Sequence, residues 1–193
     1  TELIEYYKGI FTILSSCASR QLEEVTFRRT VIPVQELLDA AGKYFKKLMK
    51  NRPERIELEI EPMEAKVIGD VNQLRFLLEN LIDEALSVPV SGKIRLTCAV
   101  EDDFVRFLFT DMRREKTREE LNQLFYPNLV RMTAGEKGKL CGTEYLLCKQ
   151  IIRDHDEFAG RRGCRINAEP AEKGGFAVYF TLPRYLKRIQ PGR

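Results

Sequence analysis

The chain has 193 residues, of which 44% are hydrophobic and 32% are charged, and its formal net charge is +3. This balance excludes an intrinsically disordered chain, and the net charge is too small to indicate a nucleic-acid-binding protein. No apolar run has the length that a membrane span needs. One histidine, and five cysteines without a Cys-x-x-Cys pair, disfavour a zinc site and indicate reduced thiols in a cytosolic setting.

The first 50 residues predict two helices with an extended segment between them. Residues 3–19 carry apolar side chains over a wide face, so we expect this helix to pair with another helix, upstream or in a second chain. The stretch "EVTFRRTVI" then predicts a short strand or an extended link. Pro33 opens the next helix at its first turn, and that helix runs to about Lys50.

Two short strands and a long helix follow. Residues 55–61 alternate apolar and charged side chains, as a half-buried strand does, and residues 65–69 predict a second strand. Asp70 caps a helix over about residues 71–87, and Gln73 completes a capping-box pattern. We expect a shared core from this helix and later elements, made of Leu74, Leu77, Leu78, Leu81, Phe109, Ile151 and Phe180.

The second half of the chain predicts two hairpins and two helices. In chain order the elements are strands 93–100 and 104–111, a short helix 117–125, a loop 128–141, a helix 142–155, and strands 161–170 and 175–183. Thr117 and Glu120 form a second capping-box pattern. Hairpin strands with helices that cover one face predict an α+β fold, a two-layer sandwich.

This order of elements, with these residues, resembles the ATP-binding catalytic domain of sensor histidine kinases, a Bergerat-type fold shared with gyrase and MutL. The most specific piece is "VIGDVNQLRFLLENLIDEAL"; "KIRLTCAVEDDFVRFLFTD" is similar to the central hairpin that ends in an aspartate, and "GGFAVYFTLP" to the last strand. The resemblance implies that residues 1–22 are the C-terminal helix of a dimerisation and phosphoacceptor hairpin. Residues 23–185 would then be the ATPase domain and residues 186–193 a basic tail.

The resemblance also implies a nucleotide site. In the family, a helical asparagine coordinates Mg²⁺, and another polar residue lies one turn earlier. Asn80 matches the earlier position, where it would help to position the reacting groups, and Glu84 matches the metal position, where a carboxylate is a competent ligand. Asp111 matches the aspartate that accepts the adenine amino group. The alternatives are a solvated helix face for Asn80 and Glu84, and a strand-end turn for Asp111.

Several positions depart from the family's glycine motifs. Arg113 and Glu115 stand at two glycine positions beside the adenine, where long side chains replace poorly a residue that allows close approach. In the later glycine-rich motif, which presents N–H groups to phosphates at a helix start, only Gly142 is left. Glu144 follows it and would repel a triphosphate. These changes imply weak or lost ATP binding.

Two lysines and the single histidine complete the candidate residues. Lys137 and Lys139 lie in the predicted loop 128–141, at the place of the family's nucleotide lid, and from there they would reach the phosphates. The alternative for both is a charged loop without that role. His155 stands at a helix end and is interpreted as structural. It is not the phosphoacceptor by position, so any acceptor histidine lies upstream or on another protein.

The resemblance therefore implies the catalytic domain of a two-component sensor histidine kinase, with ATP and Mg²⁺ as cofactors if it is active. The alternative is a non-catalytic signalling or dimerisation scaffold that supports phosphotransfer without ATP hydrolysis, so enzyme activity stays open. The implied partners are a second copy, through the upstream hairpin, and a response regulator. The implied location is cytoplasmic, with membrane contact only through upstream regions of an anchored sensor.

Overall fold

The computed structural model describes residues 26–126 and 144–187, the backbone of residues 133–134 and 140–141, and positions 3, 4, 7 and 11. The helices are α2 (Val34–Met49), α3 (Val71–Leu86), α4 (Arg118–Asn122) and α5 (Glu144–Phe158). The strands are β1 (Thr30–Pro33), β2 (Ile56–Ile60), β3 (Lys66–Gly69), β4 (Gly92–Glu101), β5 (Phe104–Asp111), β6 (Thr133–Ala134), β7 (Leu140–Cys141), β8 (Ile166–Pro170) and β9 (Phe176–Pro183).

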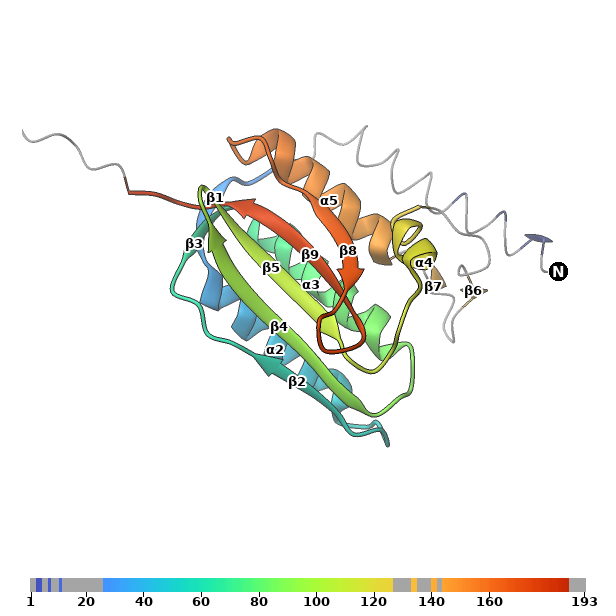
Figure 1. The fold of residues 1–193 in the computed structure, drawn as a ribbon. Coiled ribbons are helices and arrows are strands. Elements are labelled where there is room, and N and C mark those ends of the chain that lie inside the picture. The colour runs from blue at the N-terminus through green and yellow to red at the C-terminus, as the bar shows by residue number, and fades with distance from the viewer. Residues whose placement is uncertain are drawn as a thin grey trace, which may run out of the picture.

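The main sheet is mixed. Its strand order is β2-β4-β5-β9-β8, with β2 parallel to β4 and every other neighbouring pair antiparallel. Strands β1 and β3 form a separate antiparallel pair. Helices α2, α3 and α5 cover one face of the main sheet (Figure 1). The predicted two-layer α+β sandwich is confirmed.

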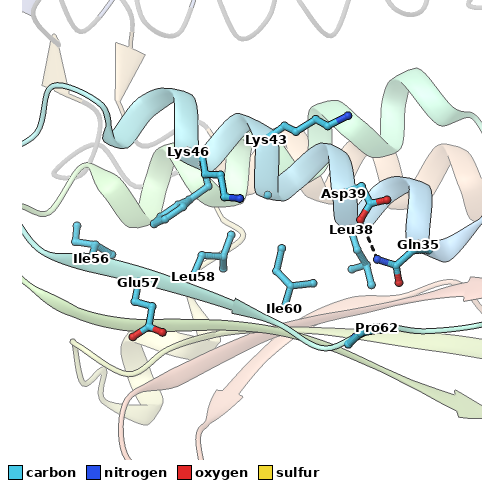
Figure 2. Close-up of a pocket in the computed structure, with 12 residues that line it drawn as sticks. Gln35, Leu38, Asp39, Lys43, Lys46, Ile56, Glu57, Leu58, Ile60 and Pro62 are labelled. Carbon is cyan, nitrogen blue, oxygen red and sulfur yellow. Dashed lines mark hydrogen bonds between the residues drawn. The ribbon is translucent and has the colours of Figure 1, made fainter.

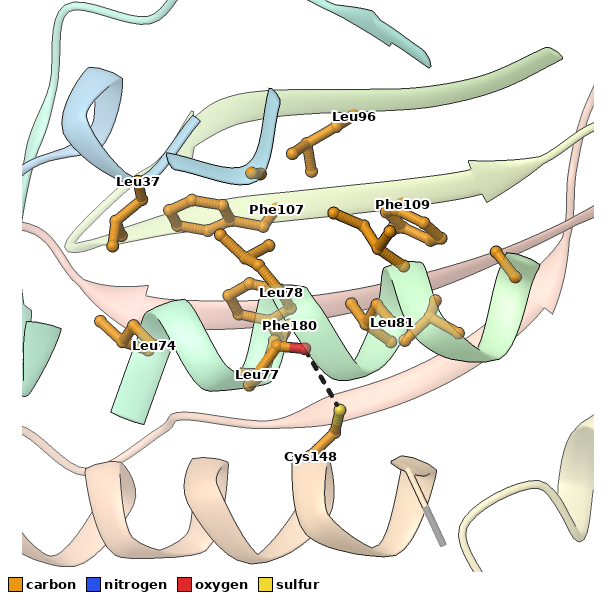
Figure 3. Close-up of a cluster of buried hydrophobic side chains, with 14 of the residues drawn as sticks. Leu37, Leu74, Leu77, Leu78, Leu81, Leu96, Phe107, Phe109, Cys148 and Phe180 are labelled. Atoms are coloured by element: carbon orange, nitrogen blue, oxygen red, sulfur yellow. Dashed lines mark hydrogen bonds between the residues drawn. The ribbon is translucent and has the colours of Figure 1, made fainter. Parts of the chain in front are cut away.

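The core lies between α3 and the central strands. All seven side chains predicted for it are buried: Leu74, Leu77, Leu78, Leu81, Phe109, Ile151 and Phe180. Figure 3 shows the leucines of α3 pointing at the phenylalanines of the sheet, and the rings of Phe107 and Phe180 stack with centroids 4.7 Å apart. The other side of α3 packs on α5, where the thiol of Cys148 donates to the carbonyl of Leu77. Helix α3 is therefore the central element of the helical layer.

The start of α3 confirms only half of the predicted capping box. The Asp70 carboxylate accepts from the backbone N–H groups of Asn72 and Gln73, at 3.0 and 3.1 Å. The returning bond from Gln73 is absent, because the N–H of Asp70 donates to Nε2 of His155 instead, at 3.1 Å. The Gln73 Oε1 atom is buried without a hydrogen-bond partner. The capping box of Thr117 and Glu120 in α4 forms completely.

His155 is a structural residue in this fold. Its side chain is fully buried, and Nδ1 lies 2.8 Å from the carbonyl oxygen of Ile151. Since Nε2 accepts from Asp70, the Nδ1–H donates to that carbonyl, and the ring is the neutral tautomer. Burial lowers the pKa of His155 below its ordinary value of 6.5, although the hydrogen bond to Ile151 acts in the opposite direction.

This environment predicts a pH-dependent stability. Above pH 6.5 the imidazole is neutral in both states and contributes nothing. Below that pH the unfolded chain binds a proton more readily than the folded one, so the unfolding free energy falls, by at most about 1.36 kcal/mol per pH unit. We expect urea midpoints to drop between pH 7 and pH 5.5, and His155→Gln to remove most of this drop. A ring that titrates at its ordinary pKa by NMR would contradict the prediction.

Two segments differ from expectation or are not described. The predicted loop 128–141 contains the short paired strands β6 and β7. The predicted helix over residues 3–19 lies outside the described residues except at four positions, so the domain boundaries stay predictions. Among the helices that the structure describes, none combines the length and the apolar character that crossing a bilayer requires.

Candidate nucleotide site

The candidate residues meet where the C-terminal half of α3, the end of β5 and the start of α5 come together. Asn80 and Glu84 lie one turn apart on α3, so their side chains share a face of the helix. Asp111 is the last residue of β5. Glu144 and Tyr145 open α5 and are both buried. The structure therefore brings together the helix and strand residues that the resemblance singled out.

Asn80 is held by its own helix. Its side chain is buried, and its Nδ2–H donates to the carbonyl of Phe76 at 2.8 Å. A solvated helix face, the alternative interpretation of Asn80, does not describe a side chain that is 3% exposed.

Asp111 is the centre of a network of ionic hydrogen bonds. Its carboxylate accepts from the N–H, Nε and Nη2 of Arg113, at 3.0, 2.9 and 2.9 Å, and from Nε of Arg114 at 2.9 Å. Burial by itself raises the pKa of Asp111, but the hydrogen bonds and charges of the two arginines lower it below its usual value. The carboxylate is therefore ionised and already saturated with donors.

Arg113 fills the space beside Asp111. Its side chain is 0% exposed. Nη1 donates to the carbonyls of Val88 and Val90, and Nη2 to the carbonyl of Ala85 at 2.6 Å. With the two side-chain bonds to Asp111, each of the five guanidinium N–H groups has an acceptor. A guanidinium with every donor satisfied is a stable occupant of a buried site.

The backbone around Arg113 is shaped for its side chain. Gly92 has φ 141°, and a Cβ atom there would lie 2.8 Å from Cγ of Arg113. The carbonyls of Ala85, Val88 and Val90 belong to the end of α3 and the link to β4, and they converge on one guanidinium. The chain around Arg113 thus accommodates its side chain.

Arg114 connects Asp111 with Glu84. Its Nη1 and Nη2 atoms lie 3.4 and 3.1 Å from the two oxygens of Glu84, a bidentate pair. The hydroxyl of Tyr145 also donates to Glu84. Burial and the neighbouring Glu84 raise the pKa of Tyr145 well above its usual value, so the hydroxyl keeps its proton. The negative charges of the Asp111 and Glu84 carboxylates equal the positive charges of the Arg113 and Arg114 guanidinium groups, so this cluster is neutral.

The cleft residues, as arranged, do not fit Mg-ATP. A metal at Glu84 needs free carboxylate oxygens, and both are bonded to Arg114. An adenine at Asp111 needs an acceptor and space, and Arg113 takes both. We therefore derive no catalytic step through the nucleotide.

Some candidates lie outside this arrangement. Gly142, Lys137 and Lys139 fall outside the residues whose side chains the structure describes. Glu115 is exposed rather than turned into the cleft. The resemblance assigned both Arg113 and Glu115 to glycine positions beside the adenine. Only the side chain of Arg113 is buried beside Asp111. The sequence signal for this network is the pair Arg113 and Arg114, two and three residues after Asp111, because it brings two guanidinium groups close to one carboxylate.

Comparisons with known proteins agree with this architecture. The sequence profile of the family described as "Histidine kinase-, DNA gyrase B-, and HSP90-like ATPase" matches residues 69–186. A comparison with curated protein sequences finds no match.

Solved structures share the fold at low sequence identity. A nucleotide-free catalytic domain of histidine kinase ThkA has a TM-score of 0.62 at 21% identity, over 81% of this chain and 97% of that one. Mycobacterial sensor histidine kinase MprB has a TM-score of 0.61 at 19% identity, over 81% and 98%. ThkA in complex with the response regulator TrrA has a TM-score of 0.63 at 20% identity, over 96% of this chain and 51% of that one.

The family profile covers more than half of the chain, and the described fold is the one that these kinase domains have. The chain therefore belongs to the histidine kinase-, DNA gyrase B- and HSP90-like ATPase family, and it has the fold of the histidine kinase catalytic domains.

Proposed function

We propose that this chain is the ATPase-type domain of a two-component sensor histidine kinase whose nucleotide cleft is filled by its own arginines, and that it binds ATP weakly or not at all. One observation carries the proposal: the side chain of Arg113 is fully buried and all its donors are bonded, three of them to carbonyls at the end of α3 and in its link to β4. Adenine reaches Asp111 only if this side chain leaves, which costs the free energy of its hydrogen bonds.

The alternative that we weigh against it is an active kinase domain. In that case Asn80 positions the reacting groups, Glu84 holds Mg²⁺ and Asp111 accepts the adenine amino group. Gly142, Lys137 and Lys139 then contact the phosphates. Phosphoryl transfer depends on positioning and charge neutralisation, so this alternative requires both arginines to leave the cleft when the nucleotide binds.

A titration with a non-hydrolysable ATP analogue and Mg²⁺ distinguishes the two. We expect calorimetry to show no saturable binding at concentrations that saturate intact histidine kinase domains, and the melting temperature to stay unchanged, because a ligand stabilises only a state that it binds. Saturable binding that depends on Mg²⁺ would favour the active kinase.

A domain that does not bind ATP is able to act in signalling as a scaffold. We propose that it acts as a scaffold that passes conformational state, or supports phosphotransfer, within a dimer and toward a response regulator. The neutral network of Glu84, Arg114, Asp111 and Arg113 supports this, because it ties α3, β5 and α5 together without a ligand. We place the domain in the cytoplasm, in a sensor whose upstream regions provide any membrane anchor.

Dimerisation through the upstream hairpin gives a separate prediction. The described positions of the first helix, Leu3, Ile4, Tyr7 and Phe11, are each more than half exposed, between 58% and 72%. Apolar side chains at this spacing lie on one helical face and favour a partner helix. We expect a chain extended upstream to sediment as a dimer, and the double variant Tyr7→Glu, Phe11→Glu to sediment as a monomer. A monomeric extended chain would contradict the prediction.

A further inference from the structure

Within the part of the chain that the structure describes, the strand at one edge of the main sheet has no partner on its outer side. Strand β2 ends the order β2-β4-β5-β9-β8. The carbonyl of Arg55 accepts from Gly92, and the N–H of Glu61 donates to Leu96. In a parallel ladder the bonded residues alternate, so Glu57 and Glu59 also bond to β4. The amides and carbonyls of Leu58 and Ile60 therefore point to the open edge.

Beside this edge lies a groove of about 700 Å³ between α2 and β2, lined by apolar side chains of both elements and by polar residues of α2 that include Gln35 and Asp39. Figure 2 shows Ile56, Leu58 and Ile60 pointing from β2 toward α2, and Leu38 pointing back toward them. Ile60 packs closely against the wall of α2 at Gly42, because a Cβ atom there would lie only 3.3 Å from its Cδ1. The groove thus combines free backbone groups with apolar pockets, the two elements that an added strand uses.

The charged residues beside the open edge indicate which side chains an added strand should carry. On the face of β2 away from α2, Glu59 pairs with Lys93 and Arg95 of β4, at 3.2 and 3.3 Å. Glu57 lies on the same face and has no ion pair with another described residue. A strand added at the open edge would place its outward side chains beside Glu57 and Glu59, where opposite charges stabilise a pair and like charges destabilise it.

A second copy of β2 does not fit this edge. Pairing of two β2 strands about a two-fold axis would bring the glutamates of both copies together on one face. On the groove side, the stems of Lys43 and Lys46 line the wall of α2 and are able to cover apolar side chains of a guest while their ammonium groups stay in solvent.

We propose that the groove between α2 and β2 binds an extended segment of another protein by strand addition to β2. The segment alternates apolar residues, which enter the groove, with lysine or arginine, which face Glu57 and Glu59. The groove lies between α2 and β2, whereas Arg113 and Arg114 bond to residues of α3, β5 and the link to β4. The proposal does not depend on ATP binding.

The test uses the chain labelled with ¹⁵N and two blocked synthetic peptides, one alternating valine with lysine and one alternating valine with glutamate. We expect the valine–lysine peptide to protect the amides of Leu58 and Ile60 from hydrogen exchange, while those of Glu57 and Glu59 are protected already. We expect the valine–glutamate peptide to bind about tenfold more weakly, since it replaces attractive pairs with Glu57 and Glu59 by repulsive ones.

Two variants locate the binding. Glu57→Lys should reverse the preference between the peptides, and Gly42→Leu, which fills the groove, should weaken both by about tenfold or more. The matched control Glu119→Lys makes the same charge change on the exposed surface of α4 and should change neither. No binding of the valine–lysine peptide, equal binding of both peptides, or binding that leaves the Leu58 and Ile60 amides unprotected would overturn the proposal.

Discussion

Emptying the cleft is expected to restore ATP binding. The variant Glu84→Asn, Arg113→Gly, Glu115→Gly, Glu144→Gly should bind Mg-ATP at least ten to a hundred times more tightly than the unmodified chain, a difference of about 1.4 to 3 kcal/mol. Arg113→Gly removes the side chain that occupies the space beside Asp111. Glu84→Asn releases Arg114 and removes a carboxylate from the phosphate region.

Single substitutions separate the contributions to the expected increase in ATP affinity. Arg113→Gly alone should give the largest part, because adenine has no space while the guanidinium is bonded to three carbonyls. Glu115→Gly alone should change little, since Glu115 is exposed. Calorimetry measures both.

The control must carry the same net change in charge, because a more positive chain attracts a triphosphate nonspecifically. The variant Glu119→Gln, Glu172→Gln provides it with two exposed side chains outside the cleft, and it should bind no better than the unmodified chain. A folded cleft variant without binding would contradict the idea that the arginines block an otherwise complete site. Tight binding by the unmodified chain would return the domain to the active kinases.

Loss of Asp111 is expected to destabilise the fold strongly. Asp111→Asn leaves the guanidinium of Arg113 buried without its counter-charge, and breaking a buried pair in this way costs about 3–5 kcal/mol. In an open nucleotide site, the same aspartate would face solvent when ATP is absent, and its loss would cost much less. The unfolding free energy therefore distinguishes a structural Asp111 from a ligand-binding one.

A double-mutant cycle makes this prediction specific. The variant Asp111→Asn, Arg113→Met replaces the buried charge by an apolar chain of similar length, and it should be more stable than Asp111→Asn alone. The exposed pair of Arg161 and Asp103 is the matched control, and Asp103→Asn should change stability by less than about 1 kcal/mol. Urea denaturation measures these variants together with the unmodified chain and the single variant Arg113→Met, which completes the cycle. A cost below about 1 kcal/mol for Asp111→Asn would show that the network is dispensable.

Much of the fold follows from short-range patterns. The spacing of Leu74, Leu77, Leu78 and Leu81 places them on one side of a helix whatever surrounds it, and all of them are buried. Alternation in residues 56–60 likewise fixes which side chains of β2 face the helical layer. These predictions succeed because the geometry of a helix or strand depends on neighbouring residues.

Predictions that required a distant partner were less complete. Asp70 and Gln73 have the pattern of a capping box, but the N–H of Asp70 is taken by His155, which lies 85 positions further along the chain. The strand pattern of residues 55–61 did not show that β2 would pair with β4 at the edge of the sheet, while β3 would pair with β1. Pairing is decided by which elements the whole chain brings together.

The sequence by itself determined the family pattern and the helix that carries Asn80 and Glu84, and it predicted the departures from the glycine motifs. Only the tertiary structure decided where the arginine side chains go: Arg113 into the buried space beside Asp111, and Arg114 onto Glu84. The physical reason is that arginine is long and has several rotatable bonds. Its direction is set by the acceptors within reach, here Asp111 and the carbonyls of Ala85, Val88 and Val90, which converge only when α3, its link to β4, and β5 have packed together.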